Sequence, residues 1–373
     1  MNFTNQSYIF ERYRPITSMF EEFSPVGVMA EKILPPVWYI AGFIGNPISA
    51  FIWLGQRMRR NNSSAVYLGF LSLTDMIFLI LNLMYLLHTT WGYKVYNDHV
   101  SCEIFLLAYY VPQYLSTFLV MGFTVERYVA VCHPFMKEKW CTVRKALIII
   151  LFLSTFSFLL ASAHSYLWAY HTDMDVCSHR QNVDSDFITW WILITDVAVF
   201  VLVPVIVLIF NVMVIREISK ISKNNVVHRQ QNRRGNGVTS TVTLLAVSFY
   251  LILTQISATV VGLLHQAFPF GDPFMSDEDI RKDQTWSRFF TFQDVRKVVE
   301  VICLSHYAIY FFIYCATGKH FQKEVLYLLT LQGRLPFLAT MLSTKRRKEH
   351  YTMVSTNGCA VSEMYTTNMS TTI

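Results

Sequence analysis

Long runs of apolar residues dominate the pattern of this chain. Seven runs approach or exceed the roughly 20 residues that a helix needs to cross a bilayer, and five of them contain no Asp, Glu, Lys or Arg. In a bilayer each run must be helical to satisfy its backbone hydrogen bonds. The predicted spans are Ile33–Gln56, Asn61–Tyr93, Ile104–Val125, Ala146–Thr172, Phe187–Ile215, Gly235–Gly271 and Val301–Gly318, the last with a start near Val295.

The segments between the runs form two sets that differ in charge. One set is basic and includes the run Lys345–Lys348, whereas the opposite set is rich in aspartate. The positive-inside bias places the basic set in the cytoplasm and the N-terminus outside. An outside N-terminus and an inside C-terminus require an odd number of spans, in agreement with seven.

This topology divides the chain into four parts. We expect an extracellular N-terminus at 1–32 and a seven-transmembrane bundle at 33–318. Residues 319–331 place Phe321 and Val325 opposite Lys319 and Lys323, which predicts an amphipathic helix on the inner leaflet. Residues 332–373 form a cytoplasmic tail, Ser/Thr-rich from Thr352 onward, that we expect to be largely disordered and open to phosphorylation.

The composition supports a membrane protein. Hydrophobic residues make up 53% of the chain and charged residues only 15%, against about 25% charged in soluble domains. No long alternating segments indicate a barrel. Residues 1–29 contain charges and no apolar core, so we expect the first span to act as an uncleaved insertion signal. Membrane lipids are expected partners, and nucleic acid is not.

Seven cysteines are present, and their spacing matches no zinc site. Only Cys102 and Cys177 fall in predicted outer segments, so one disulfide between them is expected. It would hold the loop after span four over the mouth of the bundle. The glycosylation motifs at Asn2 and Asn5 would be accessible outside the cell. No cofactor or resident metal is expected.

The segment Thr124–Pro134 places a carboxylate beside a guanidinium where the third span ends. Ionisable residues at membrane depth are costly and tend to be functional. Glu126 and Arg127 are therefore candidate functional residues. The alternative is a membrane-interface anchor, because Arg often extends its charged head to the interface at helix ends.

These features together resemble a rhodopsin-like (class A) G protein-coupled receptor, an all-α membrane fold with seven transmembrane helices. The resemblance covers roughly Pro36 to Leu329, and parts of it are similar to invertebrate neuropeptide receptors of the FMRFamide-receptor-like group. The matching positions are Gly45-Asn46, Leu71–Asp75, Trp91-Gly92, Cys102 at 25 residues before Arg127, Glu126-Arg127-Tyr128 with Cys132-His133-Pro134, Pro204, Tyr314, Gly318 and Phe321.

The resemblance implies a switch at the cytoplasmic end. Glu126 pairs with Arg127 in the inactive state, and Arg127 meets a heterotrimeric G protein in the active state. Tyr128 and Tyr314 belong to the same coupling region. The acidic latch common at the base of span six is missing from the segment 235–238. We therefore expect appreciable basal signalling, controlled chiefly by Glu126.

Asp75 is a charge near the middle of the membrane and calls for a partner or an ion. The resemblance implies a polar site of Asp75, Ser116 and Asn46, where related receptors bind sodium. His306 and Tyr310 replace the usual span-seven asparagines. Two interpretations stay open: a sodium ion at Asp75, or no ion and an Asp75 that is protonated or bonded to His306.

Spans six and seven depart from the family pattern. Ile252–Gln255 replaces Cys-Trp-x-Pro, and Tyr310–Tyr314 replaces Asn-Pro-x-x-Tyr. The proline kink, the tryptophan and the span-seven asparagine are therefore missing. Gln255 either takes part in the activation relay or is a polar residue that bonds inside the bundle.

The ligand is constrained more by exclusion than by assignment. Tyr109 replaces the aspartate of amine receptors, and span seven has no lysine for retinal. Aromatic walls below acidic outer loops suit a basic or amidated peptide. The alternatives are that the acidic loops are simply solvated, or that the ligand is a non-peptide small molecule. The expected pocket residues are Tyr109, Tyr110, Gln113, Trp190, Trp191, Gln255 and His265.

Two other classes fit the sequence less well. A transporter or channel would show internal repeats or several charges at the midplane, and an intramembrane enzyme would need paired acids or His clusters. Only Asp75 and Asp196 lie well inside spans. We therefore expect a plasma-membrane neuropeptide receptor and not an enzyme. Its partners would be a peptide, a G protein and, through the tail, arrestin and receptor kinases.

Overall fold

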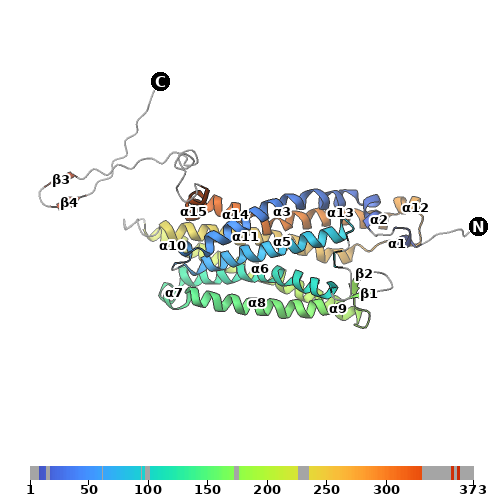
Figure 1. The fold of residues 1–373 in the computed structure, drawn as a ribbon, viewed down its shortest axis with the longest axis horizontal. Coiled ribbons are helices and arrows are strands. Elements are labelled where there is room, and N and C mark those ends of the chain that lie inside the picture. Colours follow the sequence, from blue (N-terminus) through green and yellow to red (C-terminus); the bar gives the residue numbers. More distant parts are fainter. Residues whose placement is uncertain are drawn as a thin grey trace, which may run out of the picture. The chain divides into compact units, whose positions relative to one another are not determined.

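The computed structural model describes residues 8–13, 17–60, 62–93, 95–96, 101–171, 176–225, 235–329, 354–356 and 359–361. The chain divides into two units, residues 1–322 and 323–373. The first is a bundle of long helices (Figure 1). Its elements are α1 Ile9–Arg12, α2 Thr17–Phe23, α3 Pro25–Leu54, α4 Gln56–Arg59, α5 Ser63–Thr89, α6 Ser101–Cys132, α7 Pro134–Trp140, α8 Val143–Tyr166, β1 Trp168–His171, β2 Val176–His179, α9 Ser185–Val197, η1 Ala198–Leu202, α10 Val203–Asn225, α11 Gly235–Leu264, η2 His265–Ala267, α12 Asp277–Lys282, α13 Gln284–Leu304 and α14 His306–Thr317.

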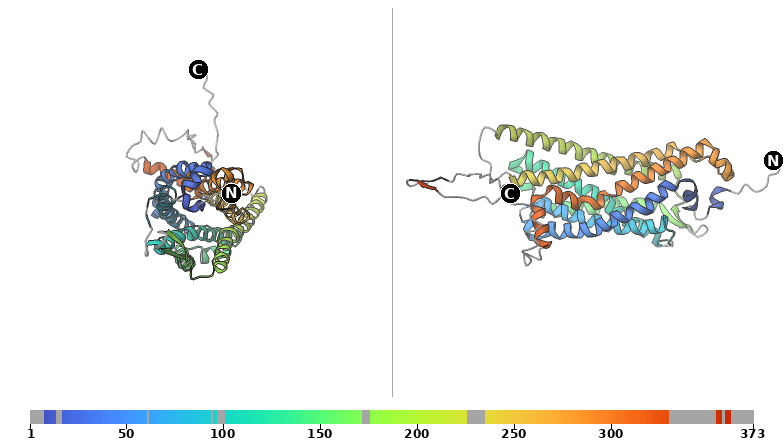
Figure 2. Two further views of the ribbon diagram at one scale, coloured as in Figure 1. Left: turned by 90° about the vertical axis from the view of Figure 1, so that its right-hand side faces the viewer. Right: turned by 90° about the horizontal axis from the view of Figure 1, so that it is seen from above.

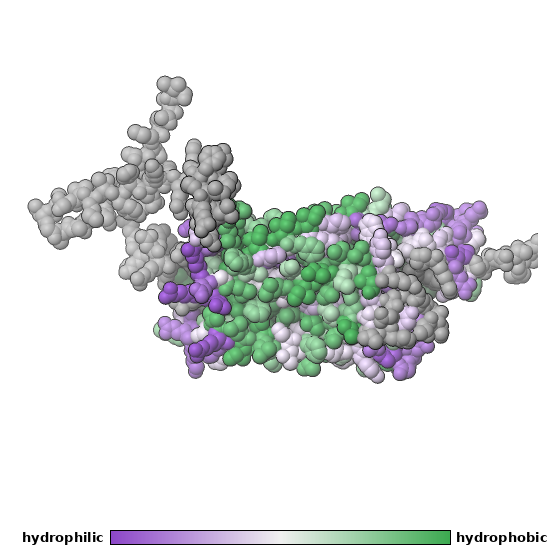
Figure 3. Space-filling view, viewed as in Figure 1, coloured by the Kyte–Doolittle hydropathy of each residue, from purple (hydrophilic) through white to green (hydrophobic). Residues whose placement is uncertain are grey.

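Seven spans are present in the described part of the bundle. Six continuous helical segments are long and apolar enough to cross a membrane, and the bent pair α13–α14 forms the seventh. The predicted seven-helix fold is therefore confirmed. Figure 3 shows the expected surface: apolar side chains cover the middle of the bundle, and polar side chains gather at its two ends.

The third span occupies the centre of the bundle. Helix α6 packs against α5, α8, α10 and α11, whereas α3 packs against α5, α13 and α14. The end-on view in Figure 2 shows the helices arranged in a ring. Because α6 contacts so many neighbours, a residue on it can affect several spans at once.

Local chemistry explains several helix boundaries. The side chains of Thr142, Asp184 and Asp283 accept backbone hydrogen bonds at the starts of α8, α9 and α13, as N-cap residues do. The fifth span contains the π-helical turn η1 directly before Pro204. Proline lacks an N–H and disturbs the helical ladder, so a wider turn is expected there.

The predicted start of span seven is wrong. The helix begins at Gln284, well before Val295, and bends by 43° between α13 and α14. Its first half was not recognised because it carries several charged and polar residues and is not a continuous apolar run. The bend lies at Ser305, whose hydroxyl is hydrogen-bonded to Ile302 O and to the Tyr250 hydroxyl. A kink thus exists although the family proline is missing, because side-chain hydroxyls contact the backbone there.

The two ends of the bundle are called outer and cytoplasmic here, after the topology predicted from the loop charges. The N-terminal segment folds onto the outer end of span seven. Ile9 and Met19 are buried in a cluster with Ile280, Trp286 and Phe290. Helix α3 also begins at Pro25, before the predicted start of span one. The described part of 1–32 is therefore a folded cap, whose elements are drawn together in Figure 1.

The predicted end of span four is also wrong. Helix α8 ends at Tyr166, and the chain continues into the antiparallel hairpin of β1 and β2. The segment Trp168–His171 is apolar enough to extend the run, but its aromatic residues also favour a strand. This hairpin lies at the outer end of the bundle.

The second unit begins within α15, which spans Lys319–Leu329 and agrees with the predicted helix. Six residues of the tail are described: Val354–Thr356 and Cys359–Val361 pair as strands β3 and β4. The predicted disorder of the rest of the tail lies outside the described residues and stays a prediction. These residues include the β-branched types that favour strands.

Candidate functional site: an outer pocket, a buried aspartate and a cytoplasmic arginine

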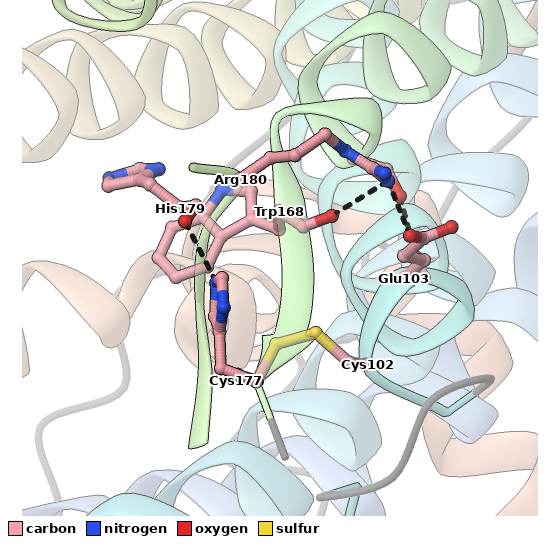
Figure 4. The surroundings of a disulfide bond; sticks show 8 residues. Cys102, Glu103, Trp168, Cys177, His179 and Arg180 are labelled. Atoms are coloured by element: carbon pink, nitrogen blue, oxygen red, sulfur yellow. Dashed lines mark hydrogen bonds and ion pairs between the residues drawn. A yellow bond between two sulfur atoms is a disulfide. The ribbon is translucent and has the colours of Figure 1, made fainter. Parts of the chain in front are cut away.

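A disulfide attaches the hairpin to the third span, as predicted. Cys102 near the start of α6 is bonded to Cys177 in β2. Beside it, Arg180 donates hydrogen bonds to the Glu103 carboxylate at 2.5 Å and to the Trp168 carbonyl at 3.3 Å (Figure 4). The hairpin is thus held to α6 by one covalent bond and one ion pair.

A cluster of aromatic side chains lies beside the disulfide, between spans two and three. Tyr96 and Phe105 are buried and stack at 4.0 Å between ring centroids. Tyr109 and Tyr110 pack against the same cluster, and the Tyr109 hydroxyl accepts a 3.1 Å hydrogen bond from Asn82. The structure therefore brings these two predicted pocket tyrosines together.

The fifth span orients its two tryptophans differently. Trp190 is 61% exposed and shares an apolar exposed stripe with Phe187 and Ile194. Trp191 is half-buried. Consecutive helical residues project about 100° apart, so the prediction that both line the pocket is wrong for Trp190, which faces outward.

The remaining predicted pocket residues are spread over the outer half of the bundle. Gln113 lies on α6, and its Oε1 is buried without a hydrogen-bond partner in the described structure. The His265 ring lies 3.3 Å from Gln293 Nε2 on α13. Gln255 lies deeper, with Nε2 at 3.3 Å from His306 Nε2.

Charged residues of span seven were missed by the sequence reasoning. Glu300 forms a 2.7 Å ion pair with Arg296 on α13. The signal that could have found it is an acid one helical turn after an arginine, at the outer end of a membrane-length run. Glu300 is therefore an acidic side chain of α13 that is engaged by a neighbouring arginine.

Asp75 is completely buried in span two. Its Oδ1 accepts a 2.7 Å hydrogen bond from Ser116 on α6. The other carboxylate oxygen has no hydrogen-bond partner among the described residues, and the same holds for Asn46 Oδ1 and the Tyr310 hydroxyl. The structure therefore brings Ser116 to Asp75 and leaves the other carboxylate oxygen available for water or a cation.

His306 does not bond to Asp75, so this part of the prediction is wrong. Its Nδ1 lies 2.7 Å from Cys303 O, and its Nε2 lies 3.3 Å from Gln255. Both ring nitrogens are thus engaged elsewhere. Asn46 donates a 2.8 Å hydrogen bond to Tyr307 O and links spans one and seven. Sodium binding stays a prediction, and the described residues contain no cluster of three His, Cys, Asp or Glu that could hold a metal.

At the cytoplasmic end, Glu126 and Arg127 contact the start of span two. The Glu126 carboxylate accepts hydrogen bonds from Ser63 at 2.8 Å and from Ser64 at 2.6 Å. Arg127 donates a 3.2 Å hydrogen bond to Asn62 Oδ1. The expected ion pair between Glu126 and Arg127 is not formed in the described structure, because adjacent helical residues diverge and the first turn of α5 offers a partner to each.

Arg127 also borders a narrow crevice. Its volume is about 10 Å³, too small for more than one water. Tyr128 lies 3.3 Å from His133 Nε2 and packs on Phe210, and buried Tyr314 packs on Trp53 and Phe321. The crevice is lined by Phe123, Thr124, Arg127, Asn211, Val214, Thr241, Leu244 and Leu245 from spans three, five and six.

Two groups of predictions lie outside the described residues. Asn2 and Asn5, the expected glycosylation positions, are among them, as are the side chains of 235–238, where the second latch is missing from the sequence. Their roles stay predictions.

A seven-helix bundle with a bridged outer loop, a buried aspartate in span two and a cytoplasmic arginine in span three defines a class of membrane receptor. The chain matches the family "7 transmembrane receptor (rhodopsin family)" over residues 45–292. It therefore belongs to this family and is a multi-pass membrane protein, a receptor rather than an enzyme.

Several known receptors are similar to this chain. The chain is 28% identical to the thyrotropin-releasing hormone receptor of Gallus gallus over 143 residues, which cover 37% of the chain and 34% of that receptor. It is 22% identical to cephalotocin receptor 1 of Octopus vulgaris, with 69% and 61% covered, and 23% identical to C-C chemokine receptor type 1 of Macaca fascicularis, with 78% of each covered. The match to the thyrotropin-releasing hormone receptors thus spans about a third of their length.

Proposed function

We propose that this protein is a plasma-membrane receptor that binds an extracellular neuropeptide and activates a heterotrimeric G protein. The observation that carries the proposal is that one continuous helix, α6, contains both the tyrosines proposed to contact the ligand and the arginine proposed to contact the G protein. Tyr109 and Tyr110 lie at its outer half and Arg127 at its inner end. The 18 residues from Tyr109 to Arg127 span about 27 Å at 1.5 Å per residue.

The outer pocket favours a ligand with both apolar and cationic groups. Tyrosine rings supply large contact areas and attract cations over their faces. The Glu300 carboxylate supplies an acidic group on α13, where it is paired with Arg296. A basic or amidated peptide matches this set of groups, and names such as thyrotropin-releasing hormone receptor and neuropeptide receptor 18 among the similar proteins support a peptide ligand.

The cytoplasmic end supports coupling to a transducer. Among the described residues, Arg127 has one hydrogen bond to another span, at Asn62 directly before α5, and it borders a crevice that is narrow in this structure. Opening the crevice would expose Arg127 to a G protein, and a partner that binds the open state shifts the population toward it. We place the N-terminus outside and the C-terminal tail inside, where receptor kinases and arrestin would act on its Ser and Thr residues.

A screen of amidated neuropeptides tests this proposal. Cells that express the receptor are expected to respond to a basic member with a change in calcium or cyclic AMP, above an appreciable basal level. Glu300→Gln should raise the peptide concentration needed for a half-maximal response by about tenfold, as expected for the loss of one charged contact. Glu278→Gln, on exposed helix α12, is the matched control and should change little.

Two outcomes would contradict the proposal. Ionic current or substrate flux without any G protein response would indicate a channel or transporter. An equal loss of potency in Glu278→Gln and Glu300→Gln would indicate that the outer acids act only through general surface charge.

A further inference from the structure

At the start of span two, the side-chain oxygen of Asn62 can accept a hydrogen bond either from Arg127 or from a backbone amide of α5. Asn62 directly precedes α5, at the position where Asn commonly caps a helix with its side-chain oxygen. Its side chain forms no such cap in this structure. Instead, Oδ1 accepts a hydrogen bond from Arg127 Nη2 at 3.2 Å. The arginine has thus taken an acceptor that the backbone amides of α5 would otherwise use.

The neighbouring contacts hold this arrangement in place. The Ser63 and Ser64 hydroxyls both donate to Glu126 Oε1 and are almost completely buried. They fix the end of α6 against the start of α5, so Arg127 is presented to Asn62. The two uses of Oδ1 are comparable in strength, since a helix cap and a hydrogen bond to a charged group stabilise by similar amounts. A small bias can therefore decide between them.

We propose that Asn62 is a two-position switch residue. In the state described here its side chain holds Arg127; when Arg127 turns toward a transducer, the same oxygen caps α5. The freed helix end is then stabilised at the moment that Arg127 loses its partner. Asn62 is a positioning residue in this role, and the inference rests on the proposed function of Arg127 in coupling.

Two substitutions separate the two uses. Asn62→Ser keeps a good capping group but is too short to reach Arg127, so it should raise basal signalling by about threefold. Asn62→Gln can still reach Arg127 but caps poorly, so it should lower basal signalling by a similar factor. Changes of basal signalling in opposite directions in the two variants, measured at equal surface expression, support the switch. Changes in the same direction would overturn it, because a purely structural role predicts a loss in both.

Hydrogen exchange tests the competition without any G protein. Arg127→Ala should slow exchange of the Ser64 amide in the purified receptor, because Asn62 Oδ1 is then free to cap it; the Ala65 amide already donates to the Asn62 carbonyl at 3.3 Å. The double variant Arg127→Ala with Asn62→Gln should not show this slowing. Unchanged exchange in Arg127→Ala would overturn the switch. If exchange slows as expected but no variant or peptide alters signalling, the proposed function fails and the switch stands.

Discussion

The two ends of the bundle are held together by different kinds of contact. At the outer end, the N-terminal segment and α12–α13 share a buried aromatic cluster, and Asp294 accepts hydrogen bonds from Ser24 and from the Gly27 amide, each at 2.6 Å. The cytoplasmic end also has an aromatic cluster, in which Tyr314 packs on Trp53 and Phe321. Among the described residues, however, the side chains of Glu126 and Arg127 are hydrogen-bonded only to the small polar side chains of Asn62, Ser63 and Ser64.

This difference has a physical consequence. Large buried aromatic contacts and a disulfide each stabilise by several kcal/mol and resist rearrangement, whereas a single hydrogen bond contributes about 1 kcal/mol net and is easily exchanged. The outer aromatic cluster is therefore suited to keep its shape, and the hydrogen bonds of Glu126 and Arg127 are suited to change. The proposed function requires this difference between the two sites.

The same substitution at opposite ends gives the largest expected difference. Trp286 is 0% exposed in the outer cluster, whereas Trp140 in α7 is 49% exposed on the cytoplasmic side. Trp286→Ala should destabilise the receptor by about 3–5 kcal/mol, the range for large buried aromatic residues. Trp140→Ala should change stability by less than about 1 kcal/mol. Thermal unfolding of the detergent-purified receptor measures both, and equal losses would contradict a difference between the two ends.

The disulfide gives the next largest effect. Cys102→Ser or Cys177→Ser should lower stability by about 2–4 kcal/mol, because each frees the hairpin from α6. The double variant should lose no more than either single one, since they remove the same bond. Cys315→Ser is the control, because Cys315 is a free, half-buried thiol. A loss in the control as large as that in Cys102→Ser would assign the effect to the thiol and not to the bond.

Features that depend on local pattern could be predicted from the sequence. Run length alone determines how many helices can cross a membrane, and loop charge separates the outer cysteines from the others, so the seven spans and the Cys102–Cys177 bond were both found. The contact of Ser116 with Asp75 followed from the family resemblance.

Features that depend on partners far apart in the sequence, apolar or polar, could not be predicted. The cluster of Ile9 with Trp286 joins segments far apart in the chain, and neither segment is apolar enough to indicate burial. The partners of Glu126 lie on another helix, so its hydrogen bonds to Ser63 and Ser64 have no signature near Glu126 itself. Periodicity indicates which face is buried, but it does not indicate which neighbour fills the space.

The smallest expected effect is electrostatic and lies at the cytoplasmic end. Cys141 lies between α7 and α8, and burial raises the pKa of its thiol; the Glu126 carboxylate raises it further, while Arg127 and Lys137 oppose the change. A raised pKa leaves less thiolate at a given pH, and thiolate is the reactive form. Alkylation of Cys141 should therefore reach half its maximal rate at a higher pH than alkylation of an unfolded thiol.

Glu126→Gln should move this alkylation profile to lower pH, because it removes a negative charge that disfavours the thiolate. The shift is expected to be small, since Cys141 is partly exposed and solvent screens the charge. Glu138→Gln removes the same charge three residues from Cys141 and should leave the profile unchanged. Mass spectrometry of the Cys141 peptide separates it from the other thiols. A shift of equal size in both variants would mean that the Glu126 charge acts on Cys141 no more strongly than the Glu138 charge does. The contacts of Glu126 with α5 would then not direct its charge toward the neighbouring Arg127 and Asn62.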